Sequence, residues 1–205
     1  PVILWNHRWE RDKQPARFTD VIDALLSKSI PFRLIVCGEH FREIPSCFLK
    51  IKERLGDRLL HFGFAESRAE YADLLSRSDI VVSTALQEYF GISVVEAMYA
   101  GAFPLLPNRL AYPELIPAEY RDRVLYEDNE LIDKLERAIQ CFAAGTLPDL
   151  RNTAQQYDWS HRIESYDRLF DRPNTRRIHP IRNQQGAGRS AAILPNNSLR
   201  FSFVM

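Results

Sequence analysis

The segment Glu88-Tyr-Phe-Gly-Ile-Ser-Val-Val-Glu96 runs directly into Ala97-Met-Tyr-Ala-Gly-Ala-Phe-Pro104. Its apolar residues predict a buried helix reached from a loop, with Gly91 where the helix begins and one glutamate on either side of that point. A helix start of this kind presents unpaired backbone N–H groups and a positive dipole end. Such amides can bind a phosphate, while the carboxylates can accept hydrogen bonds from hydroxyl groups. The combination predicts a site for a nucleotide sugar.

The interval between the two glutamates carries little weight by itself. Glu119 and Glu127 have the same spacing without a glycine between them. The surroundings matter more, because Glu96 lies among apolar residues of the expected helix and an unpaired buried charge is very costly. Its carboxylate therefore needs a partner, which could be a ligand or a structural salt bridge.

Short apolar runs alternate with segments of helical periodicity. The runs predict strands at residues 2–5, 32–37, 59–62, 80–83, 103–106 and 124–126. The periodicity predicts helices near residues 18–26, 48–55, 71–75, 91–100, 131–142, 150–157 and 163–170, with Pro15 in a first turn, Gly56 as a C-cap and Ser67 as an N-cap. This alternation indicates an α/β fold with a parallel sheet and helices on both faces. Ligands of such sheets bind at the C-terminal ends of the strands.

The composition is that of an ordinary globular chain. Of its 205 residues 45% are hydrophobic, and 27 Lys and Arg residues balance 27 Asp and Glu residues, so no global basic field attracts nucleic acid. The length suits one generous α/β domain, and no apolar run approaches the roughly 18 residues of a membrane span, so we expect no membrane partner. Three cysteines without CxxC spacing favour reduced thiols in a cytoplasmic protein over a disulfide or metal framework.

A charged stretch, His7-Arg-Trp-Glu-Arg-Asp-Lys13, follows the first expected strand. At the mouth of a parallel sheet Arg8 and Lys13 could clamp a diphosphate, the arginine as a planar fork and the lysine as a point charge. A solvated run of charges is the alternative interpretation. The chain has neither a G-x-G-x-x-G fingerprint nor a P-loop, so a nucleotide would not be bound in the manner of NAD or ATP.

Together these motifs resemble the donor site of retaining GT-B glycosyltransferases. The resemblance comprises Glu88-x7-Glu96 with Phe90-Gly91 inside it, then Ala97-Met98 and Gly101-x-x-Pro104. Arg8 and Lys13 resemble the phosphate-binding pair of that family, and its donor-site loops correspond to Ser83-Thr84 and Phe62-Gly63-Phe64. The resemblance covers about residues 1–170, and the motifs occur in the order of the family.

A narrower resemblance is to the group of tRNA-queuosine mannosyltransferases, which use GDP-mannose. It depends on Trp5-x-His7-Arg8-Trp9-Glu10-x-Asp12-Lys13, Tyr112-Pro113-Glu114 and Pro117-Ala-Glu-Tyr120. One departure from the wider family is Asn6-His7, where a glycine often precedes the arginine. The backbone has less freedom at this point than in the wider family.

The resemblance implies a role for each site residue. Arg8 and Lys13 would neutralise the diphosphate and stabilise it as the leaving group, and Glu88 would contact hydroxyls of the transferred sugar. These three are the expected catalytic residues. The expected donor-binding residues are Glu96 for the ribose hydroxyls, the amides of Gly91 and Ile92 for phosphate, the backbone near Gly63 and Phe64 for the base, and Thr84 and His7 in the pocket. The family transfers with retention and without a metal, and the chain has no Asp-x-Asp pair.

We therefore expect residues 1–170 to form a Rossmann-like nucleotide-sugar-binding domain, the C-terminal half of a GT-B fold, and residues 171–205 to form a disordered or irregular tail. The chain does not begin with Met, so we expect a missing N-terminal half that binds the acceptor and could bring in tRNA. By itself the fragment should bind its donor and transfer little. Two alternatives stay open, another retaining hexosyltransferase that uses a UDP- or GDP-sugar, and a non-catalytic nucleotide-sugar-binding module.

Overall fold

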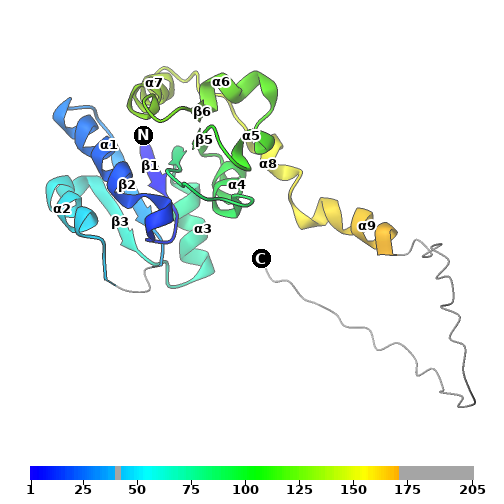
Figure 1. Cartoon of the computed structure of the whole chain (residues 1–205). Coiled ribbons are helices and arrows are strands. Elements are labelled where there is room, and N and C mark those ends of the chain that lie inside the picture. Colours follow the sequence, from blue (N-terminus) through cyan, green and yellow to red (C-terminus); the bar gives the residue numbers. More distant parts are fainter. Residues whose placement is uncertain (40–42, 171–205) are drawn as a thin grey trace, which may run out of the picture.

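Six parallel strands form one sheet in the order β3-β2-β1-β4-β5-β6 (Figure 1). They belong to a computed structural model that describes residues 1–39 and 43–170, so the expected tail at 171–205 lies outside the described residues. The strands are β1 (Val2–Trp5), β2 (Arg33–Cys37), β3 (Leu59–Gly63), β4 (Ile80–Val82), β5 (Phe103–Pro107) and β6 (Leu125–Tyr126). The predicted α/β fold with a parallel sheet is confirmed.

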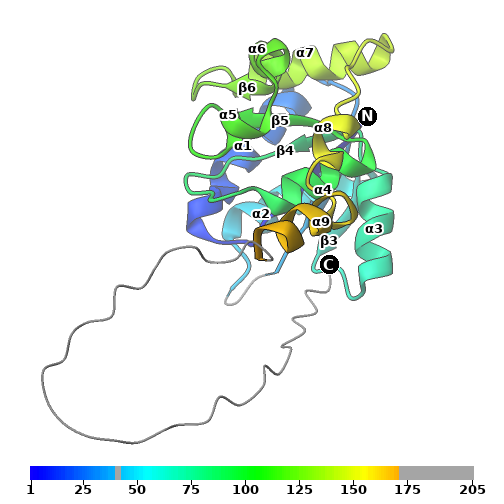
Figure 2. The same cartoon turned by 90° about the vertical axis from the view of Figure 1, so that its right-hand side faces the viewer.

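Helices cover both faces of the sheet, as predicted. The helices are α1 (Pro15–Ser27), α2 (Ser46–Leu55), α3 (Arg68–Ser76), α4 (Ile92–Ala100), α5 (Tyr112–Leu115), α6 (Arg121–Val124), α7 (Leu131–Ala143), α8 (Arg151–Gln155) and α9 (Trp159–Phe170). Helix α1 packs against α2 and α7, whereas α4 packs against α3 and α8. Figures 1 and 2 show α1 and α2 on one side of the strands and α3 and α4 on the other. No helix among the described residues is long and apolar enough to cross a membrane.

The helix termini follow the local sequence signals. Pro15 lies in the first turn of α1, Gly56 is the C-cap of α2, and Ser67 is the N-cap of α3, where its Oγ accepts a hydrogen bond from the Glu70 amide at 3.1 Å. Gly91 is the N-cap of α4 with a φ of 91°. A Cβ at this position would lie 3.1 Å from Cε1 of Tyr112, so both the conformation and the space favour glycine.

The core is centred on β1, whose four residues are all buried. Its last residue, Trp5, stacks on Phe18 of α1 with ring centroids 5.5 Å apart and meets Phe48 of α2 edge-on at 5.2 Å. Trp9 extends the aromatic cluster beyond the strand by contacting Phe48 and Phe62. The loop that leaves β1 is therefore anchored at its base to the most deeply buried part of the domain.

Two loops meet at the C-terminal ends of the neighbouring strands β1 and β4. The Thr84 hydroxyl accepts from Nε1 of Trp5 at 3.0 Å and donates to the carbonyl of Lys13 at 2.7 Å. The Leu86 amide donates to the carbonyl of Asp12, also at 2.7 Å. Chain order reverses between β1 and β4, and parallel sheets bind their ligands at such a switch point. These hydrogen bonds hold the two loops that border the switch point.

We predict that Thr84→Val lowers the free energy of unfolding by about 2 kcal/mol, because it leaves a Trp5 N–H and a Lys13 carbonyl without partners in the interior. Urea unfolding measures the change. Thr19→Val is the matched control, since Thr19 is also buried but, within the described ranges, its hydroxyl donates only to the Ala16 carbonyl of its own helix. Equal stability losses in the two variants would contradict the assigned role of Thr84.

Candidate functional site

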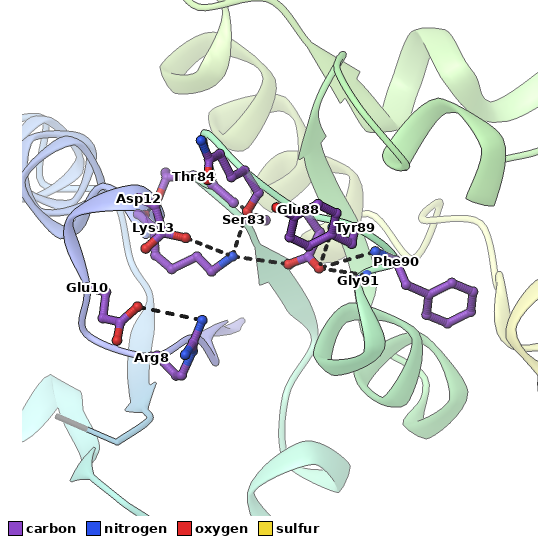
Figure 3. Close-up of polar contacts among 12 residues, drawn as sticks. Arg8, Glu10, Asp12, Lys13, Ser83, Thr84, Glu88, Tyr89, Phe90 and Gly91 are labelled. Carbon is purple, nitrogen blue, oxygen red and sulfur yellow. Dashed lines mark hydrogen bonds and ion pairs between the residues drawn. The ribbon is translucent and has the colours of Figure 1, made fainter. Parts of the chain in front are cut away.

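Lys13 links the loop after β1 to the loop before α4. It ends the 3₁₀ turn Arg11–Lys13, and only 10% of its side chain is exposed. Its Nζ donates to the Gln87 carbonyl at 2.6 Å and lies 3.3 Å from both Oε2 of Glu88 and Oδ2 of Asp12 (Figure 3). A nearly buried ammonium needs such acceptors, because the unpaired charge would be costly to desolvate. The lysine thereby holds Glu88 against the mouth of β1.

Glu88 uses its second oxygen to shape the start of α4. Its Oε1 accepts from the amides of Tyr89 at 3.1 Å, Phe90 at 3.3 Å and Gly91 at 3.0 Å (Figure 3). Burial favours the neutral acid, but the Lys13 charge and the amide donors outweigh it and hold the pKa of Glu88 below its usual range. Within the described part of the chain, the next amide, that of Ile92, meets no acceptor. It stays open at the positive end of the helix.

Arg8 occupies a different setting from Lys13. Its side chain is 56% exposed and makes a long ion pair of 3.6 Å with Oε2 of Glu10. Exposed pairs of this kind contribute about 0–1 kcal/mol, so the guanidinium can exchange Glu10 for another anion at small cost. The structure places Arg8 and Lys13 on one loop, the arginine in solvent and the lysine in the interior.

A cavity of about 490 Å³ opens beside this loop, at the C-terminal ends of β1 to β3. Three of the predicted site residues line it, namely His7, Arg8 and Phe64. Gly63 lies at its edge, where the Gly63 carbonyl accepts from the Gly38 amide at 2.9 Å. The other lining residues are Asn6, Cys37, Gly38, Glu39, Ala65, Glu66, Ser67, Arg68 and Tyr71. Lys13, Thr84, Glu88, Gly91, Ile92 and Glu96 lie outside this lining, and the Thr84 hydroxyl is taken by its internal hydrogen bonds.

Glu96, on the second turn of α4, has a neutral partner. The Tyr71 hydroxyl donates to its Oε2 at 2.9 Å, and Nδ2 of Asn6 bonds to the same hydroxyl at 3.1 Å. Among the described residues Glu96 forms no ion pair, so the structural salt bridge considered above is absent there. A carboxylate oriented by a phenol keeps its full charge and can accept further hydrogen bonds from hydroxyl groups.

His7 is enclosed between the sheet and the next loop. It is 4% exposed, meets Trp5 edge-on at 5.2 Å, and its Nε2 has no partner among the described residues. Burial and the nearby Lys13 charge lower its pKa to about 4. A Cβ on Gly38 would come within 1.9 Å of the His7 carbonyl, so the glycine allows the two loops to approach. The imidazole is therefore neutral at physiological pH.

Among the cavity-lining residues to which the sequence analysis assigned no site role are Asn6, Gly38 and Tyr71. A polar residue directly after a buried strand is a usable signal for Asn6, and a glycine ending a strand is one for Gly38. Nothing in the periodicity of α3 distinguishes Tyr71 from a residue of the core.

The site combines two cations on the loop after β1, an open amide at the start of α4 and a carboxylate on the second turn of that helix. Arg8, Lys13 and the Ile92 amide suit a diphosphate, because each offers a positive charge or a hydrogen-bond donor near the C-terminal end of β1 or the start of α4. Glu96 suits hydroxyl groups, because an anion would be repelled there. In the described part of the chain no group of three or more His, Cys, Asp or Glu side chains could hold a metal ion. The arrangement fits an anionic diphosphate flanked by polyhydroxylated groups.

A family model and curated relatives indicate the same family of proteins. The family model described as Glycosyl transferases group 1 matches residues 1–157. The tRNA-queuosine alpha-mannosyltransferase of Drosophila melanogaster is 44% identical over 117 residues, which are 57% of this chain and 31% of the relative. The GDP-mannose:cellobiosyl-diphosphopolyprenol alpha-mannosyltransferase of Xanthomonas campestris is 26% identical over 173 residues, 80% of this chain and 45% of the relative. The chain thus spans less than half the length of these curated relatives.

Solved structures share the fold. The catalytic domain of cholesterol-alpha-glucosyltransferase from Helicobacter pylori matches with a TM-score of 0.60 and 21% identity, over 77% of this chain and 98% of that one. The Anabaena protein HepE, solved with UDP and glucose, matches with a TM-score of 0.60 and 17% identity, over 83% of this chain and 48% of that one. The Rossmann-like sheet described above is therefore the one found in such catalytic domains.

We predict that buried His7 makes the domain less stable in mild acid. The unfolded chain protonates this histidine near pH 6.5 and the folded chain only near pH 4, so between these values the unfolded state binds more protons and stability falls as the pH falls. From pH 8 to pH 5 the loss that depends on His7 is about 2 kcal/mol. Urea unfolding of wild type and His7→Asn at both pH values measures it. Parallel pH profiles would refute the prediction.

Proposed function

The chain belongs to the retaining group 1 glycosyltransferases, and on that premise we propose that it binds GDP-mannose and supports transfer of mannose to queuosine in tRNA. The observation that carries donor binding is the contact of Lys13 with Glu88, which brings a cation, a carboxylate and the start of α4 together. Mannose and queuosine are supported by the name of the Drosophila relative, and GDP-mannose by the name of the Xanthomonas relative.

The diphosphate would lie between Arg8, Lys13 and the first open amide of α4. Positive charge at this point stabilises the negative charge that develops on the departing nucleoside diphosphate, an effect that often supplies the largest share of catalysis. The Gly91 amide is occupied by Glu88, so it reaches a phosphate only when that carboxylate turns away. Glu88 would then face the hydroxyls of the sugar.

The nucleoside would fill the cavity beside β1 to β3. Glu96 would accept the two ribose hydroxyls, since its neutral partner leaves its charge and most of its acceptor capacity open. The base would lie against the backbone near Gly63 and Phe64, whose ring is 63% exposed at the cavity wall. Neutral His7 would line the pocket. Thr84 would not contact the nucleotide but would hold the loop of Lys13 through its hydrogen bond to the Lys13 carbonyl.

The acceptor would bind to a part of the protein that this chain does not include. The chain covers only 31% of the queuosine mannosyltransferase relative, and its net charge of zero provides no general attraction for tRNA. We therefore propose that the remaining part of the protein supplies the tRNA contacts and that this domain by itself transfers little.

We predict that the 205-residue chain binds GDP and GDP-mannose more tightly than UDP or UDP-glucose in calorimetric titrations. Arg8→Ala should weaken GDP binding about tenfold, because one charge-assisted contact to phosphate is lost. Arg11→Ala, an exposed arginine three residues along the same loop, is the control and should leave affinity within about twofold.

Each contrary result has a distinct meaning. No binding of any of the four compounds by a folded chain would exclude the donor site. Tighter binding of UDP would exclude GDP-mannose and favour a UDP-sugar hexosyltransferase of the same family. If Arg8→Ala and Arg11→Ala change GDP affinity equally, Arg8 does not contact the phosphates.

We predict that Glu88→Ala in the full-length protein lowers mannose transfer at least about 100-fold, since it removes the proposed sugar contact and the partner of Lys13. Glu119→Ala, an exposed glutamate with a second glutamate eight residues on, should transfer normally. Melting temperatures check that both variants fold. Unchanged transfer in Glu88→Ala would instead support a non-catalytic nucleotide-sugar-binding module.

A further inference from the structure

Tyr71 joins three segments that are distant in the sequence. It lies on the first turns of α3 and lines the cavity. Its hydroxyl donates to Oε2 of Glu96 on α4 at 2.9 Å and receives a hydrogen bond from Nδ2 of Asn6, directly after β1, at 3.1 Å. One phenol thus connects the loop of β1 with the helix that carries Glu96.

The direction of these hydrogen bonds is determined by the Asn6 amide. Its Nδ2 also donates to the Ser93 carbonyl at 2.8 Å, so both of its N–H groups are in use. The reversed amide would set its oxygen against that carbonyl, two acceptors facing each other. Donation therefore runs from Asn6 to Tyr71 and from Tyr71 to Glu96. Burial and the Glu96 charge raise the pKa of Tyr71, so the phenol keeps the proton that it donates.

This orientation of the Asn6 amide leaves its oxygen, Oδ1, without a hydrogen bond. Asn6 lines the cavity and is 6% exposed, but its Oδ1 is enclosed and has no partner among the described residues. A buried acceptor without a partner costs about 1–3 kcal/mol. The two donor contacts of Nδ2, to the Tyr71 hydroxyl and to the Ser93 carbonyl, therefore determine the orientation at the expense of Oδ1.

We propose that Tyr71 and Asn6 are positioning residues that orient the Glu96 carboxylate toward the ribose hydroxyls of the bound nucleotide. The inference rests on the proposed function, because it presupposes that a nucleotide fills the cavity. Tyr71 occupies one lone pair of Oε2 and leaves Oε1 and the rest of Oε2 to accept two hydroxyl donors. Because the partner is neutral, those hydrogen bonds are made to a fully charged acceptor and are correspondingly strong.

The test compares nucleotides with and without ribose hydroxyls. Calorimetry measures the affinity of the 205-residue chain for GDP and for 2′,3′-dideoxy-GDP, or for the UDP pair if the wild type prefers UDP. The wild type should prefer the hydroxylated nucleotide. Tyr71→Phe should reduce that preference about fivefold while affinity for the dideoxy compound stays unchanged.

Tyr99→Phe is the matched control. Tyr99 lies on α4 and, like Tyr71, donates to a carboxylate, here Oδ2 of Asp158 at 3.0 Å, but it lines no part of the cavity. Its loss should leave the preference for ribose hydroxyls intact. If Tyr71→Phe does not fold, Asn6→Ala provides the same comparison, with a smaller loss in the same direction.

The possible failures are distinguishable. A folded wild-type chain that binds neither GDP nor UDP overturns the proposed function and this inference with it. A wild type that binds without preferring ribose hydroxyls overturns the role of Glu96. Binding with a preference that Tyr71→Phe retains, or equal losses for both nucleotides, leaves donor binding in place and reduces Tyr71 to a structural contact.

Discussion

The nearly buried ammonium of Lys13 is the constraint on which the geometry of the candidate site depends. A lysine with 10% of its side chain exposed must surround itself with acceptors, and it finds them in Asp12, the Gln87 carbonyl and Glu88. Those contacts draw the loop before α4 onto the loop after β1. Beneath them, the Thr84 hydroxyl ties the same two loops to Trp5. The contact that gathers the candidate catalytic groups therefore also holds the local fold.

Much of the fold follows from the sequence because its signals are local. Each strand is a short apolar run, and glycine or serine marks helix ends at Gly56, Ser67 and Gly91. The single-turn helices α5 and α6 were not predicted, because four residues carry no measurable periodicity. The sixth strand was placed one residue too early, since Val124 still belongs to α6. Weak local signals thus account for the missed helices α5 and α6 and for the early start predicted for β6.

The residue types of the site could be predicted, but their partners could not. The partner of Glu96 depends on how α3 packs against α4, which brings Tyr71 within hydrogen-bond distance from 25 residues away. The low pKa of His7 depends on its burial among separate segments and on the charge of Lys13. Both effects arise from the packing of separate elements, and neither leaves a pattern in the surrounding sequence. The assigned donor contacts remain predictions.

Glu88 and Glu96 lie eight residues apart, yet the fold gives them different electrostatic surroundings, a cation for Glu88 and a neutral phenol for Glu96. Lys13 and three amides surround Glu88, whereas among residues 1–39 and 43–170 the partner of Glu96 is a phenol alone. A diphosphate that reaches Lys13 must compete with Glu88 for the same ammonium, because both are anions seeking one charge. Hydroxyl groups at Glu96 meet no such competitor. In the proposed donor complex, phosphate binding would therefore be coupled to the position of Glu88, and ribose binding to Tyr71 and Asn6.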